Sequence, residues 1–70
     1  MSGTVKWKTK KLLDDRHISA TELSRIAGLN YRTALDIYRE QYDRIGLVTL
    51  AKLCDALDVG ITDLLEYSKD

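Results

Sequence analysis

The sequence predicts an all-α fold, a compact bundle of five short helices. Three observations predict it. Apolar residues recur with the 3.6-residue period of a helix, the chain contains no proline, and 44% of its 70 residues are apolar. A chain of this length is near the lower limit for folding alone, and it leaves little volume for an enclosed catalytic cavity. We therefore expect residues 1–70 to form one domain.

The first element is expected over residues 6–15. Residues 4–9 alternate between apolar and polar as in a strand, but the apolar positions that follow fit one face of a helix. We expect a helix from about Lys6 to Asp15, and the alternation also allows a short strand at its start. His17 lies where this helix must turn, and histidine is one of the few non-glycine residues enriched at positive φ.

A helix start follows at Ser19. The Ser19 hydroxyl can accept from the amide of Glu22, and the Glu22 carboxylate can reach back to the amide of Ser19, which together make a capping box. Ile18 and Leu23 stand at the spacing of a hydrophobic staple, which fixes the angle at which the chain joins the helix. These signals predict a helix over residues 20–27.

A second helix start stands eleven residues later, at Asn30. Between the two lies Gly28, the natural residue for the left-handed turn that ends a helix. We expect the second helix over residues 31–39. Two helices joined by a short turn with glycine form a helix-turn-helix, here over residues 19–39. Such motifs often place their second helix in the major groove of DNA.

The second half of the chain predicts a loop over residues 41–45 and two more helices. The helix over 47–57 carries the clearest amphipathic stripe, with spacing i, i+3, i+4, i+7. Its apolar residues are Leu50, Leu53, Cys54 and Leu57. Asp58 ends this helix, and a last helix over 61–66 is expected to bury Leu64 or Leu65.

The run from Thr21 to Leu35 resembles the Cro/repressor-type (XRE-like) helix-turn-helix family, and the similarity extends over about residues 9–67. The resemblance implies a lambda-repressor-like DNA-binding domain that acts as a sequence-specific transcription regulator, with repression as the expected direction. It also implies a homodimer that reads a short palindrome in double-stranded DNA. Ala20 departs from the family because a phosphate-binding glutamine is usual there, so Thr21 would have to serve.

The resemblance also implies which residues meet DNA, since the second helix of the motif reads base edges with its N-terminal part. Arg32, Leu35, Asp36 and Arg39 form one outward stripe of that helix, with Tyr31 beside it. The base-reading candidates are Tyr31, Arg32, Leu35 and Asp36. The phosphate-binding candidates are Thr21, Asn30, Thr33, Arg39 and Arg44. In the alternative interpretation Asp36 forms ordinary surface ion pairs with Arg32 and Arg39, and Asn30 is only a cap.

Charge and composition limit the other functions. The net charge is zero, but residues 1–44 carry nine basic against six acidic residues, and residues 45–70 carry two against five. Such polarity can orient a protein on a polyanion. One histidine and one cysteine, without a metal or nucleophile motif, predict no enzyme, cofactor or small-molecule ligand. No membrane span or signal peptide is recognisable, so we expect a cytoplasmic protein.

Two questions stay open at this stage. A protein-interaction module of the same fold, such as an antitoxin-like or anti-repressor partner, is the alternative function that zero net charge favours. The dimer surface has two candidates, the C-terminal segment with Leu64, Leu65 and Tyr67, and exchange of the N-terminal segment. Trp7 and Tyr67 are expected to pack within the monomer, with contact to a second subunit as the alternative.

Overall fold

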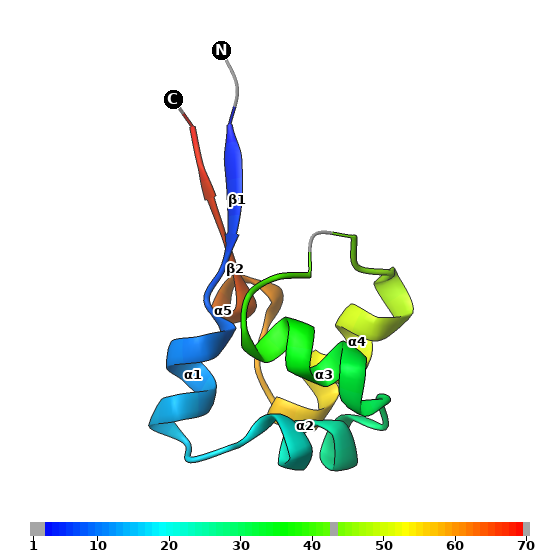
Figure 1. Cartoon of the computed structure of the whole chain (residues 1–70). Coiled ribbons are helices and arrows are strands. Elements are labelled where there is room, and N and C mark those ends of the chain that lie inside the picture. Colours follow the sequence, from blue (N-terminus) through cyan, green and yellow to red (C-terminus); the bar gives the residue numbers. More distant parts are fainter. Residues whose placement is uncertain (1–2, 43, 70) are drawn as a thin grey trace.

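The computed structural model describes residues 3–42 and 44–69, so Asp43 of the predicted loop lies outside them. Five helices pack together, and two short strands form a ribbon that projects from them (Figure 1). In chain order the elements are β1 (Thr4–Trp7), α1 (Thr9–Asp15), α2 (Ala20–Ala27), α3 (Tyr31–Tyr38), α4 (Leu47–Leu57), α5 (Ile61–Leu64) and β2 (Leu65–Ser68). The predicted helical fold class is confirmed.

The core forms where the apolar stripes of the five helices meet. Each helix contributes at least one fully or almost fully buried apolar side chain, and the largest that are fully buried are Leu13, Leu23, Ile37, Leu53 and Leu64. The stripe predicted on α4 supplies Leu50, Leu53 and Leu57 to this core, with Cys54 half-buried beside it. Of the two leucines predicted for the last helix, Leu64 is the buried one.

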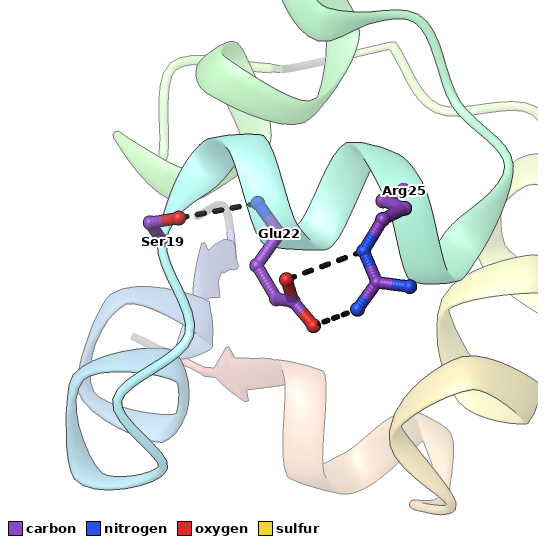
Figure 2. A network of polar contacts seen from close by, with 3 residues as sticks. All are labelled: Ser19, Glu22 and Arg25. Carbon is purple, nitrogen blue, oxygen red and sulfur yellow. Dashed lines mark hydrogen bonds and ion pairs between the residues drawn. The ribbon is translucent and has the colours of Figure 1, made fainter.

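Local signals set both bounds of α2 and the start of α3 as predicted, and α3 ends at Tyr38, one residue before the predicted Arg39. The Ser19 hydroxyl accepts from the amide of Glu22 at 3.1 Å, and Gly28 ends α2 in the left-handed region at φ 66°. The return contact from Glu22 to the Ser19 amide was predicted wrongly. Both carboxylate oxygens of Glu22 bind the guanidinium of Arg25 instead, one helical turn along (Figure 2). A charged partner on the same face outcompetes the neutral amide.

The start of the chain corrects one expectation. Residues 4–7 form the short strand that the alternation allowed, and α1 begins at Thr9 rather than at the predicted Lys6. The reason is pairing with the far end of the chain. β1 runs antiparallel to β2, with Val5 opposite Tyr67 and Trp7 opposite Leu65. Backbone bonds to a partner strand hold residues 4–7 extended.

The end of the chain corrects a second expectation. The last helix stops at Leu64 rather than Glu66, because residues 65–68 become β2. The amide of Lys8 donates to the carbonyl of Leu64 at 2.7 Å, which continues the ribbon to the point where the helices begin. At this base Trp7 packs on the core, and its indole Nε1 donates to the Tyr42 carbonyl at 2.5 Å.

Candidate nucleic-acid interface

α3 is held at its N-terminal end by its own cap and by α2. Asn30 Oδ1 accepts from the amide of Thr33 at 2.8 Å, which satisfies one of the amides that a helix start leaves unpaired. Ala34 and Ile37 are fully buried and turn one face of α3 into the core. Because α3 packs mainly on α2, the capped turn between the two helices fixes the angle at which α3 is presented.

The C-terminal end of α3 is held by α1. The buried Thr9 hydroxyl donates to the Ile37 carbonyl at 2.8 Å. In return Glu40 Oε2, which follows α3, accepts from the amide of Lys10 at 3.1 Å and caps the start of α1. The sequence offered α1 no cap of its own, since Lys8 stands at that position. These reciprocal bonds join two helix ends of opposite dipole sign.

A third contact between α1 and α3 involves an ionisable pair. The Tyr38 hydroxyl donates to Asp14 Oδ1 at 2.6 Å. This bond raises the pKa of the Tyr38 phenol above its usual 10.0, with burial and the nearby negative charge acting in the same direction. Ionised Tyr38 would lose the donated hydrogen and face a carboxylate, so the contact exists only in the protonated form. α3 is therefore fixed along its length.

The outward face of α3 is open to solvent, as predicted. Tyr31 is 52% exposed, and Arg32 and Arg39 are also exposed. Leu35 and Asp36 are half-buried and lie between them on the same stripe. The four predicted residues of this stripe and the flanking Tyr31 therefore lie together on one accessible face. Figure 1 places α3 at the front of the helical body, away from the tip of the ribbon.

Of the two surface ion pairs in the alternative interpretation, Asp36 forms the one with Arg32. Arg32 Nε lies 3.6 Å from Asp36 Oδ2, and the Arg32 side chain is 85% exposed. An exposed pair of this kind contributes about 0.2–1 kcal/mol, so it is easily exchanged for another partner. The contact uses Nε and leaves the two terminal nitrogens of the guanidinium available. The ion pair therefore orients the Arg32 side chain and leaves its terminal nitrogens free to donate to another partner.

The predicted phosphate-binding residues do not all lie on α3. Thr21 is exposed in the first turn of α2, Arg39 is exposed directly after α3, and Arg44 is exposed in the loop before α4. Thr33 is half-buried on α3. Asn30 acts as a cap through Oδ1, which leaves its Nδ2 group as a donor. Cap and phosphate ligand are thus compatible roles for Asn30.

The start of α4, where phosphate contact at Gly46 and Leu47 is a further sequence-based expectation, carries two apolar residues whose exposure the sequence analysis did not predict. Leu47 is 83% exposed and Val48 is 71% exposed, the highest fractions among the large apolar side chains described. The Gly46 position that precedes them supplies no side-chain cap, so the first amides of α4 lack a side-chain acceptor. The helical period indicates exposure for Val48, which lies opposite the Leu50–Leu57 stripe, whereas Leu47 stands at stripe spacing from Leu50 and Cys54 and is exposed at the end of the helix.

Other kinds of site receive no support from the described part of the chain. Within residues 3–42 and 44–69, no group of three or more histidine, cysteine or acidic side chains is placed to hold a metal ion. No helix formed by these residues is long and apolar enough to cross a bilayer. The one cysteine, Cys54, is a free thiol on the half-buried edge of α4.

Comparison with known proteins agrees with this geometry. A family model of the Cro/C1-type helix-turn-helix DNA-binding domain matches residues 8–70, which include every helix and the second strand. No curated protein and no solved structure matches the chain.

Proposed function

Because the chain belongs to the Cro/C1-type family of helix-turn-helix DNA-binding domains, with double-stranded DNA as its partner, we propose that it is a sequence-specific transcriptional repressor. In this proposal residues 1–70 act as one domain that reads a short palindrome as a homodimer. The observation that carries the proposal is the solvent-exposed polar stripe of α3, on a helix held at both ends by capping and hydrogen bonds.

In the proposed complex the N-terminal half of α3 enters the major groove. The terminal nitrogens of Arg32 donate to O6 and N7 of a guanine, a pairing worth about 1–3 kcal/mol of discrimination. Asp36 accepts from a cytosine N4 group or holds Arg32 in position through the existing ion pair. Tyr31 and Leu35 contact a neighbouring base or a thymine methyl group.

Phosphate contacts then set the register of the protein on the duplex. Thr21 and the first amides of α2 face one phosphate, since helix N-termini attract anions. Asn30 Nδ2 and Thr33 serve the start of α3 in the same way, and Arg39 and Arg44 supply positive charge. Because the net charge of the chain is zero, these few contacts give modest affinity at physiological salt.

The homodimer is supported by the small number of base pairs that one copy can contact. α3 is eight residues long and presents four base-reading candidates, enough for only a few base pairs. Two copies related by a two-fold axis double the contacts and match the symmetry of a palindrome.

The proposal is tested by selection of bound sequences from a random pool of duplex DNA. A two-fold symmetric consensus is expected. Arg32→Ala should then lose preference at one base position per half-site by about 5- to 150-fold, which corresponds to 1–3 kcal/mol. Arg25→Ala is the matched control, because Arg25 is an exposed arginine of α2 that binds Glu22 (Figure 2).

A salt series gives a second readout. Log affinity should fall linearly with log salt, and Arg39→Ala should reduce the slope by about one while leaving sequence preference unchanged. Failure of the random pool to yield any enriched sequence, together with capture of one stable protein partner by the purified chain, would instead favour the protein-interaction module.

A further inference from the structure

The ribbon has one apolar face and one polar face. Alternate residues of paired strands point the same way, so Val5, Trp7, Leu65 and Tyr67 share one face. Trp7 and Leu65, at the base, pack against the core. Val5 and Tyr67, further out, are 62% and 63% exposed. The apolar face therefore continues beyond the part that this chain covers.

The outer edges of the ribbon are not paired with a further strand in the described part of the chain. Within residues 3–42 and 44–69 the two four-residue strands pair with each other and with no third strand, which leaves a row of backbone donors and acceptors on each outer edge. A two-stranded ribbon of this size is marginally stable alone, and a third or fourth strand stabilises it. Beside β1 lies a mostly apolar groove of about 510 Å³, with Val5, Trp7, Tyr42, Ile45 and Leu65 in its lining and the charged Lys6 and Glu40 also bordering it.

We propose that a second copy of this chain pairs with the edge of β1, so that the two ribbons form one four-stranded antiparallel sheet. This inference deepens the proposed homodimer by naming its surface, and it rests on that part of the proposed function. A two-fold axis makes such an interface self-complementary, with the same surface contributed by both copies.

Charge selects the register of the pairing. Centring the two-fold axis on Lys6 would set two lysines directly opposite each other, which is destabilising. Centring it on Val5 sets Val5 against Val5 and Lys6 against Thr4. Each Val5 already faces Tyr67 within its own chain. The Val5 register therefore gives an unbroken apolar row across four strands, Tyr67–Val5–Val5–Tyr67.

Gly3 fits the same register. It lies opposite Trp7 of the second copy when the axis is centred on Val5. A Cβ at Gly3 would collide with the Tyr67 ring, so that ring lies across the glycine within its own chain. The pairing would bring this ring beside the indole of the second copy, and such an aromatic pair is favourable beyond the area it buries. The groove beside β1 provides the room.

Hydrogen bonds at the base of the ribbon fix the position of α3 relative to β1, and therefore relative to the two-fold axis. Trp7 is bonded to Tyr42, shortly after α3, and Thr9 is bonded to Ile37 within it. The relative placement of the two α3 helices would thus follow from the β1 pairing and would set the spacing between half-sites.

The first test is the mass of the protein in solution without DNA. Sedimentation over a concentration series should approach twice the 8.0 kDa mass of one chain. Val5→Lys should return the mass to one chain, because two lysines would meet at the axis. Val48→Lys is the matched control, since Val48 is a similarly exposed apolar residue on α4. A wild-type chain that stays at 8.0 kDa, or a dimer that Val48→Lys alone dissociates, would overturn the proposal.

The second test is cross-linking, which does not depend on a charge change. In a Cys54→Ser background, mild oxidation should join Val5→Cys chains into covalent dimers, since directly opposite Cβ atoms lie within about 4.5–5.5 Å. Lys6→Cys alone should not cross-link, whereas a mixture of Thr4→Cys and Lys6→Cys chains should. Cross-linking of Tyr67→Cys without Val5→Cys would move the interface to β2 and contradict the inference.

The two proposals fail in different ways. If DNA reading is wrong, the chain still dimerises but selects no sequence. If the β1 interface is wrong, the chain selects DNA while Val5→Lys leaves both its mass and its two-fold consensus unchanged.

Discussion

Among the residues that the structure describes, three that are not glycine take positive φ: His17, Glu40 and Asp58, at 59°, 61° and 55°. Each follows a helix and turns the chain toward the next element. Glu40 offsets the strain with a contact, since its carboxylate caps α1. Asp58 takes the left-handed position that ends α4, and its backbone amide donates to the Cys54 carbonyl.

Replacing Asp58 by glycine should therefore stabilise the protein. The left-handed conformation costs an L-residue about 1–2 kcal/mol relative to glycine, so Asp58→Gly should raise the free energy of unfolding by about 1 kcal/mol in urea titrations. Gly28→Ala is the converse control, with a loss of about 1–2 kcal/mol at φ 66°. A Cβ added at Gly28 would meet no atom within 4 Å, so the loss in this control reports backbone conformation alone.

The buried Thr9 hydroxyl offers a second prediction at this scale. Thr9→Val keeps the shape of the side chain and removes its bond to the Ile37 carbonyl, which still accepts from the amide of Glu40. The free energy of unfolding should fall by about 1 kcal/mol, the net value of one hydrogen bond. Thr9→Ser retains the hydroxyl and separates this bond from the packing of the methyl group. Equal stability of Thr9→Val and wild type would contradict the inferred role.

At the scale of elements, the helices could be predicted because their signals are local. Ser19, Gly28 and Asn30 lie within one or two residues of the bounds that they set, and α2 and α4 have the predicted bounds. The stripe of α3 follows from the helical period alone. β2 could not be predicted, since Tyr67 is held extended by Val5, sixty-two positions earlier. The long-range cap from Glu40 to α1 was missed for the same reason.

The contribution of a helix cap to the free energy of unfolding can be measured at Asn30, the N-cap of α3. Asn30→Ala removes the acceptor for the Thr33 amide and should cost about 1 kcal/mol of stability. Asn30→Asp keeps the acceptor and should lose much less. If Asn30 also binds phosphate through Nδ2, then Asn30→Asp should weaken DNA binding while leaving the urea midpoint close to that of wild type. Unchanged affinity in Asn30→Asp would restrict the residue to capping.

For the whole molecule, the contact between Tyr38 and Asp14 predicts how stability depends on pH. The pKa of Tyr38 is raised in the folded state, so the folded chain holds its proton more tightly than the unfolded chain. The contribution is present below about pH 10, the unfolded pKa, and is lost as pH rises through the folded pKa. The urea midpoint of wild type should therefore fall through this range more steeply than that of Tyr38→Phe. Parallel pH profiles would contradict the prediction.

The pairing of the two ends of the chain in the ribbon has a consequence for the order of folding. α2 and α3 can meet after closing a short turn, whereas β1 and β2 must close a loop of about sixty residues, which is entropically slower. The ribbon should then open without unfolding the helices. In native-state hydrogen exchange, the amides of Lys6 and Glu66 should exchange sooner than those of Leu23 or Ile37. α2 and α3, which we propose bind DNA, would thus stay packed together while β1 and β2 separate and pair again.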